Sequence, residues 1–493
     1  MTRLVLTAVA CLAAPLAGLA QPAPPPAVPL PTAKVGPVRL ERTLRLVGPG
    51  VPILKDSLLP PGRDRVSGNA ALGYLRAATM TPETPRDPAE AKKLRERVEA
   101  WESLPDGQFP PAAELADFLR PYRPMFRGLD DAARMATCDW QQRIGGGSEE
   151  VAVALNAVQR HREAARLLKL RARLELAEGR TADALRTLQT SLQHARHVGE
   201  AGSLIDLLVG HALATIALTQ AEQLTTRPNA PNLYWALATL PRPLIDPRPS
   251  LDGELRRTLA FLPQLAALEA GPVSEAVAAK AFQDHIKLMG GAEVNAADGP
   301  EQALAGLAQA VALAALAPAA RDELAARGWA RASLDKMPAA QAVLVRSAAL
   351  YRELWDDQVA LFFLPGPQAI AGRETVLAKS ARVVKDHPND VTLRVSAMVL
   401  PAADKVHHAH TRTERRIALF CACEAVRLHA ATHDGKLPAT LADVSVAVPN
   451  DPVTAKPFGY QVTPTGYRLD GLPPVGKVAD ATNAVTLNVT VLR

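Results

Sequence analysis

The sequence predicts a mainly helical protein with a small α+β module at its C-terminal end. Ala and Leu dominate a chain of 493 residues, while aromatic residues make up only 4% of it, a composition that favours helix over sheet. Over most of the chain apolar residues recur at spacings of three and four. The tail of the chain differs, because short stretches of alternating apolar and polar residues follow a helix there. We therefore expect a body of stacked helical hairpins closed by one helix and a short antiparallel sheet.

The first residues have the features of an export signal. Arg3 supplies a positive charge, residues 4–19 form an apolar core, and Gly18-Leu19-Ala20 offers a cleavage site between small residues. We assign 1–20 to a signal peptide and 21–37, which is rich in proline, to a stiff extended linker. No later segment is expected to span a membrane. The predicted location is exported, either periplasmic or extracellular.

Residues 38–404 are expected to form an all-α domain of helical hairpins. Proline, with 42 residues in the chain, punctuates the ends of its helices. The expected helices cover 69–80, 88–104, 112–119, 129–140, 151–178, 181–197, 203–224, 232–240, 251–270, 273–289, 303–326, 339–364, 375–385 and a segment from 390. No strand is expected within this domain.

One of these hairpins resembles a tetratricopeptide repeat. Leu174, Ala177, Gly179, Ala184 and Leu188 match that family's pattern of small and apolar positions around a turn. The resemblance implies a TPR-like, α-solenoid-like stacking of helix pairs. A second copy one repeat length away along the chain is not found, and the family's large aromatic residues are missing. A generic antiparallel helix hairpin therefore remains the alternative.

The tail, 405–493, carries a different motif. A helix over 415–431 ends in His-Asp-Gly-Lys-Leu-Pro, and Asp-Pro-Val-Thr-Ala-Lys-Pro-Phe-Gly-Tyr follows at 451–460. Strands are expected over 458–462, 467–469 and 485–491. This passage resembles the globular end of the major pseudopilin of type II secretion systems. The resemblance implies that Asp451, Pro452, Pro457 and Tyr460 fix a loop against the sheet.

Two departures limit what the pseudopilin resemblance implies. The chain has no prepilin cleavage site followed by an apolar helix with Glu at its fifth position, and that helix packs into the pilus. It also lacks the acidic cluster that holds calcium, since only Asp470 and Asp480 follow Leu469. Neither pilus assembly nor calcium binding is therefore expected.

A wider resemblance covers most of the chain. The export signal, Asn69 with Tyr74, the Cys138-Asp139-Trp140 triplet and the aromatic segment around Trp235 are similar to a family of uncharacterised exported bacterial helical proteins. That family implies no known activity.

Few residues are candidates for chemistry. Glu424 falls on the apolar stripe of its helix, so its carboxylate must be paired with an arginine or a backbone N–H, and we predict a structural anchor there. His429 and His433 lie four apart and could share a metal on one helix face. The residues between them include no Glu, unlike a zinc protease, and His433 could instead favour the helix C-terminus. We therefore assign no metal, cofactor or catalytic residue.

The function expected from these observations is not enzymatic. With 56 basic and 50 acidic residues the net charge is +6, spread along the chain, which does not favour nucleic acid as a partner. The leading hypothesis is an exported helical protein that binds a protein or peptide, or acts as a scaffold. One alternative is a component of a secretion or pilus-like machine that docks through its C-terminal module. The other alternative is a metal-dependent hydrolase.

Overall fold

The computed structural model describes residues 36–46, 55–82, 87–105, 107–141, 148–288, 300–387 and 393–492. The expected signal peptide, 1–20, and the linker up to residue 35 lie outside these ranges. Within them the protein is mainly helical and carries a four-stranded sheet built largely from its C-terminal end, as predicted.

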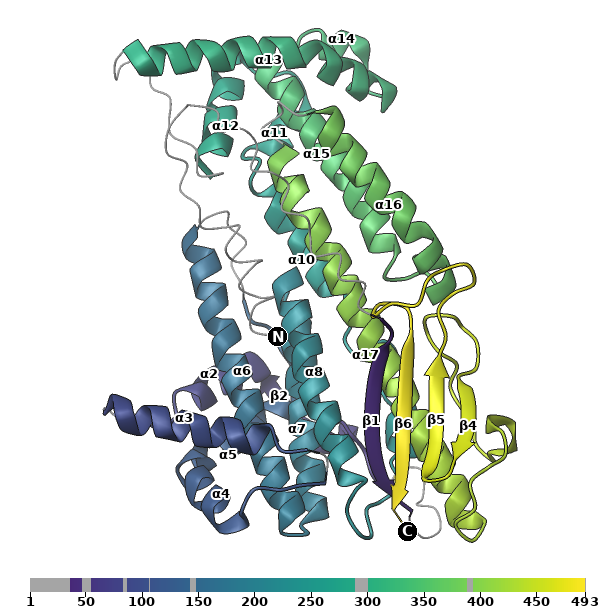
Figure 1. Ribbon diagram of the computed structural model, residues 1–493. Coiled ribbons are helices and arrows are strands. Elements are labelled where there is room, and N and C mark those ends of the chain that lie inside the picture. Colours follow the sequence, from purple (N-terminus) through teal and green to yellow (C-terminus); the bar gives the residue numbers. More distant parts are fainter. Residues whose placement is uncertain are drawn as a thin grey trace.

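Four short helices form one end of the molecule (Figure 1). They are α2 (Ala70–Ala78), α3 (Pro88–Glu102), α4 (Ala112–Leu119) and α5 (Arg123–Ala133), and beside them β2 (Val66–Asn69) pairs in parallel with β3 (Met135–Thr137). The helix expected over 129–140 was wrong in its bounds. Its second half is extended because the Asn69 side chain bonds both the N–H and the carbonyl of Asp139 at 2.8 Å.

Three long helices form the centre of the body. They are α6 (Ser148–Ala177), α7 (Thr181–Gly199) and α8 (Leu204–Leu224), and each contacts the other two. The α6–α7 turn uses Gly179 at φ +74°, a conformation that glycine adopts without strain. Within the described part of the chain α8 is the one helix long and apolar enough to cross a membrane. Its packing against α6, α7 and α17 gives it the position of a core helix.

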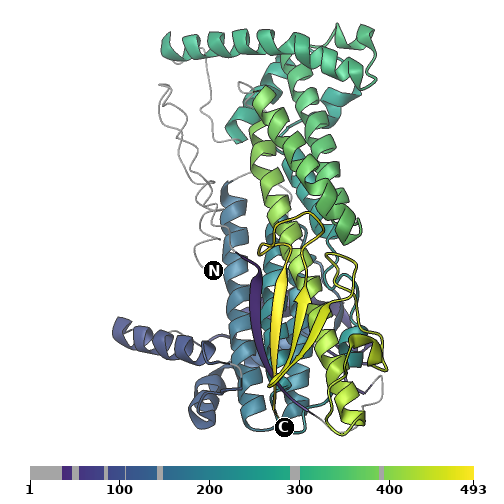
Figure 2. The same ribbon diagram turned by 45° about the vertical axis from the view of Figure 1, so that its right-hand side comes forward.

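The opposite end of the molecule holds a second core. It is formed by α11 to α14 and the first half of α15, and α13 and α14 lie far from α3 to α5 in both views (Figures 1 and 2). The helices that follow α8 along the chain are α9 (Tyr234–Ala238), α10 (Arg248–Leu259), α11 (Leu265–Ala270), α12 (Glu275–Leu288), α13 (Pro300–Ala326), α14 (Arg331–Leu334), α15 (Ala339–Ala360) and α16 (Gly366–Asp386). The segment 251–270, expected as a single helix, forms parts of two helices, α10 and α11, because Gln264 between them adopts a left-handed conformation at φ +60°.

Helix α17 (Arg394–Thr432) connects the body to the sheet. It is 39 residues long and continues through Pro401, so the helices expected from 390 and over 415–431 are one. It contacts α8, α9, α15 and α16. The chain therefore has no break at residue 405, where the C-terminal module was expected to begin.

The sheet packs on the second half of α17 as a separate layer (Figure 2). Its strand order is β1-β6-β5-β4, with β1 (Val38–Arg45), β4 (Gly459–Thr463), β5 (Gly466–Gly471) and β6 (Val485–Leu492). Pairs β4–β5 and β5–β6 are antiparallel, but β1 pairs in parallel with β6. The sheet is therefore mixed, and its first strand comes from residues that were expected to begin the all-α domain.

Candidate functional site

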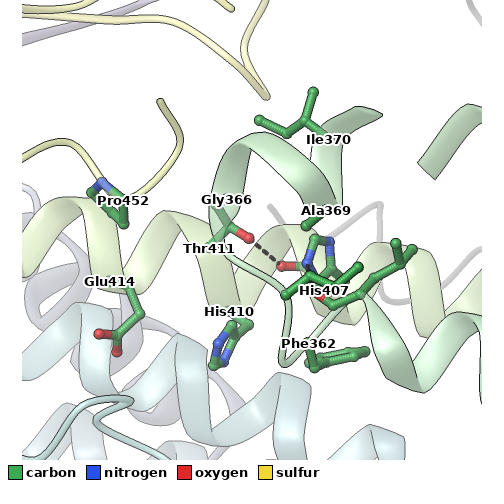
Figure 3. A pocket seen from close by; sticks show the side chains of 11 residues that line it. Phe362, Gly366, Ala369, Ile370, His407, His410, Thr411, Glu414 and Pro452 are labelled. Atoms are coloured by element: carbon green, nitrogen blue, oxygen red, sulfur yellow. Dashed lines mark hydrogen bonds between the residues drawn. The ribbon is translucent and has the colours of Figure 1, made fainter. Parts of the chain in front are cut away.

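A half-open pocket lies where the helical body meets the C-terminal module (Figure 3). Its volume is about 170 Å³. Helix α17, the connection from α15 into α16, and the Asp-Pro turn each contribute to its wall. The lining residues are Leu361, Phe362, Leu364, Gly366, Ala369, Ile370, His407, His410, Thr411, Glu414 and Pro452.

The close approach of the Asp-Pro turn to α16 depends on glycine. A Cβ on Gly366 would lie 1.8 Å from the Pro452 carbonyl oxygen, so no other residue fits there without displacing the turn. Pro365 and Pro367 flank Gly366, and a proline at the first helical turn removes an N–H that has no partner inside the helix. The Pro-Gly-Pro sequence therefore both starts α16 and forms one wall of the pocket.

Asp451 holds the turn against helix α17. Its side chain is 1% exposed and pairs with Arg415 on α17, which also donates to the Asn483 carbonyl at 3.1 Å. The second carboxylate oxygen accepts the Val453 N–H at 3.0 Å, and the Asp451 carbonyl accepts the Ala455 N–H at 2.7 Å. The turn is thus held by its own backbone and by the helix beneath it.

The other residues named by the pseudopilin resemblance differ in their surroundings. Pro452 lies at the pocket, and the Tyr460 hydroxyl donates to the Pro438 carbonyl at 3.1 Å. Pro457 is exposed, and the residue after it, Phe458, is the side chain buried against the sheet. At this point of the motif it is therefore Phe458 that packs against the sheet.

Two histidines of α17 form the floor of the pocket. His407 Nε2 donates to the Leu361 carbonyl at 3.0 Å, which leaves Nδ1 as an acceptor, and that atom is buried without a hydrogen-bond partner. His410 projects between Glu414 and Phe362 (Figure 3), and its Nδ1 is likewise buried and unpartnered. Burial lowers the pKa of His407. The pKa of His410 is lowered to about 4, mainly by burial and to a smaller extent by repulsion from His407. Both rings are neutral near pH 7.

Aromatic rings surround these imidazoles. Phe362 makes an edge contact with His407, with ring centroids 5.1 Å apart, and lies 5.7 Å from His410. His410 also meets His211 of α8 edge-on at 5.4 Å. Glu414 at the side of the pocket accepts the Leu244 N–H at 2.8 Å and faces Arg242, while its burial raises its pKa.

Glu424, the predicted anchor, is completely buried beside the sheet. Arg427 Nη1 lies 2.7 Å from both of its carboxylate oxygens, and the Leu233 N–H donates to one of them at 2.6 Å. The Asn232 amide donates to the Glu424 carbonyl, and Arg427 Nε reaches the Arg45 carbonyl at 3.0 Å. This network connects α17, β1 and the start of α9.

His429 and His433 stack on each other instead of opening toward a shared ligand. Their rings are nearly parallel, at 5°, with centroids 3.8 Å apart, and His433 Nδ1 donates to the His429 carbonyl. They are about 30–40 Å along α17 from His407 and His408, at 1.5 Å per residue. Across the described ranges no group of three or more His, Cys, Asp or Glu side chains is placed to hold a metal ion.

A second cluster gathers residues that the sequence singled out and histidines that it did not. Tyr74 of α2 and Trp140 stack with centroids 5.8 Å apart, and the Tyr74 hydroxyl lies 3.0 Å from His197 Nδ1. His161 Nδ1 and His194 Nε2 are 3.1 Å apart, and Trp140 meets His161 edge-on. The spacing of three between His194 and His197 on a buried helix face was the available signal.

The pocket itself was not predicted, although two signals were present. His407 and His410 are three apart and so lie on one helix face, and the Pro365-Gly366-Pro367 sequence marks a constrained helix start. Their meeting with Pro452 depends on tertiary packing between segments that are far apart in the sequence, which no local pattern contains. No family model matches this chain, and neither a curated protein nor a solved structure shows significant similarity to it.

Proposed function

We propose that this protein is an exported, non-enzymatic binding protein that takes a segment of a protein partner at the pocket between α16, α17 and the Asp-Pro turn. The observation that carries the proposal is a group of exposed apolar side chains around this pocket. Phe363 is 53% exposed and Leu364 is 44% exposed, immediately before α16. Large apolar side chains that gather at the mouth of a pocket are typical of protein-binding surfaces.

The loop between β5 and β6, residues 472–484, adds to the same surface. Lys477 pairs with Glu374 of α16 at 2.6 Å, one helical turn beyond Ile370 of the pocket wall. Val475 and Val478 in this loop are 91% and 82% exposed. Exposed apolar side chains are therefore present both in the segment before α16 and in a loop that contacts α16, and both offer contacts to an extended or helical segment of a partner.

Two further parts of the proposal rest on the sequence. Export, to the periplasm or beyond the cell, rests on the leader over 1–20. TPR-like stacking of the body's helical hairpins is supported by the α6–α7 pair with Gly179 at its turn. A separate docking tail is less favoured, because α17 runs without a break from the body into the module and Glu424 connects both.

Site-specific crosslinking tests the proposal. A photoreactive phenylalanine analogue is placed at position 363 and, as a matched control, at position 72 of α2, where Leu72 is 56% exposed. Irradiation of cells that export the protein should give one adduct of defined mass from position 363 and none from position 72. Equal adducts at both positions, or none at 363, would count against a partner at this surface.

A further inference from the structure

We infer that the pocket is a binding site for a single aromatic ring that carries a hydroxyl or N–H group, such as a phenol or an indole. Its meaning for the cell rests on the proposed function, in which the ring would be the side chain by which the partner anchors. The binding of a free ring requires no partner, however, and is tested separately.

The volume sets the size of the guest. The pocket measures about 170 Å³, and an apolar protein cavity of ~150 Å³ accommodates one benzene molecule. A drug-sized ligand needs about 300 Å³ or more. The space is thus sufficient for one six-membered ring and too small for a cofactor.

The walls favour an aromatic guest over an aliphatic one. Leu361, Leu364 and Ile370 supply apolar surface, while Phe362, His407 and His410 contribute three rings. Two of these already meet edge-on, with the Phe362 and His407 centroids at 5.1 Å. Aromatic pairs in offset or edge-on arrangements gain about 0.5–1.5 kcal/mol beyond the burial of their area.

The histidine at the floor of the pocket favours a guest that carries a hydrogen-bonding group. His410 lines the pocket and is 8% exposed; its Nδ1 is fully covered by protein, and its Nε2 has no hydrogen-bond partner among the described residues. A hydroxyl or N–H on the ring would give His410 Nε2 a hydrogen-bond partner. A phenol suits either tautomer of His410, because its hydroxyl both donates and accepts.

Methyl NMR with phenol and toluene as paired probes tests this site. The protein is labelled at its isoleucine δ1 methyl groups, so that Ile370 reports on the pocket and Ile205 of α8, which does not line it, serves as the reference. Phenol should shift the Ile370 signal in a saturable manner while Ile205 stays unchanged. Phenol should bind about three- to tenfold more tightly than toluene, as one net hydrogen bond implies. An Ile370 signal that does not move, or that moves only together with Ile205, would overturn the inference.

Two variants separate the ring from its hydrogen bond. His410→Phe should still bind toluene but lose the preference for phenol, and an unchanged preference would refute the role of the histidine. Leu364→Trp should fill the mouth and abolish binding, whereas Leu75→Trp, at a position of nearly equal exposure on α2, should leave it intact. Binding retained in Leu364→Trp would place the phenol elsewhere. Phenol binding without a crosslink at position 363 would support the ring site and contradict the proposed function. A crosslink at position 363 without phenol binding would support the proposed function and contradict the ring site.

Discussion

Glu424 shows how a single polar residue connects separate parts of this fold. Its carboxylate has no exposed surface, and it is matched by Arg427 and by the Leu233 N–H. The position on an apolar stripe was enough to predict a paired carboxylate. The identity of the partners was not predictable, because Leu233 lies in a distant part of the sequence, before α9.

Replacing Glu424 with Ala should destabilise the protein strongly. The change leaves Arg427 charged and buried, and the loss of one member of a buried pair costs about 3–5 kcal/mol. Urea denaturation followed by circular dichroism measures the free energy of unfolding. The control is Glu353→Ala, which removes an exposed carboxylate paired with Arg327 and Lys379 and should cost under about 1 kcal/mol. Similar losses in the two variants would mean that the Glu424 network is not a structural anchor.

The buried histidines make stability depend on pH. Burial lowers the pKa of His161 and of His197 to about 4, and burial also lowers the pKa of His194. An unfolded histidine titrates near 6.5. Between these values the unfolded chain binds more protons than the folded one, so stability is complete above pH 6.5 and falls as the pH drops toward 4. Each of the first two groups should account for about 2 kcal/mol at pH 5.

A variant isolates this effect from the buried carboxyl groups, which titrate in the opposite sense. Burial raises the pKa of Glu200, so this group favours the folded state on acidification. His161→Phe should lose less stability between pH 7.5 and 5 than the wild type does. The same change at exposed His433 serves as the control. Thermal unfolding at both pH values measures the difference, and an equal loss in wild type and His161→Phe would contradict the prediction.

At the scale of elements, the long periodic helices were predictable and their contacts with turns were not. Helices α6, α7 and α8 follow their apolar spacing closely, and the alternation of Val485, Leu487 and Val489 identified β6. Strand β1 was missed because Arg42 interrupts the alternation of Val38, Leu40 and Leu44 with polar residues. Arg42 faces inward all the same, since Glu222 pairs with it. Burial alone would raise the pKa of Glu222, but the charges of Arg416 and Arg42 hold it below its usual value.

Two glycines of α16 give a matched test of the wall between this helix and the Asp-Pro turn. A Cβ at position 366 would overlap the Pro452 carbonyl, whereas a Cβ at position 372 would lie 3.6 Å from Leu361, an ordinary contact. Gly366→Ala should therefore lower the melting temperature and open the pocket. Gly372→Ala should raise stability by about 0.5–1 kcal/mol, because alanine is the better helix former. A melting temperature of Gly366→Ala at or above that of the wild type would show that the turn does not depend on this contact.

At the scale of the whole molecule, the C-terminal module is built into the body instead of being attached to it. Its helix places Ile417, Phe420 and Ala425 in the same core as Leu213 and Leu237 of the body. Its sheet needs β1, which lies at the opposite end of the described chain from the β6 strand beside it. Such pairing between distant ends of a chain cannot form until both are available. The sequence predicted that the module begins near residue 405, because the composition of the chain changes there. The packing of α17 against the body, however, continues across this position.

Truncation of the chain at residue 404 should consequently disrupt the helical body as well as remove the module. The fragment would expose the apolar faces of α8 and α9 that α17 covers, and it would leave Glu222 without Arg416. We expect a fragment with helical far-UV circular dichroism, increased binding of a hydrophobic dye and no cooperative thermal transition, the properties of a loosely packed state. The full chain carrying Thr43→Ala, a partly exposed change on β1, is the control and should unfold cooperatively. A fragment that unfolds cooperatively and binds no dye would instead establish the body as an independent domain and return the module to the role of a separable tail.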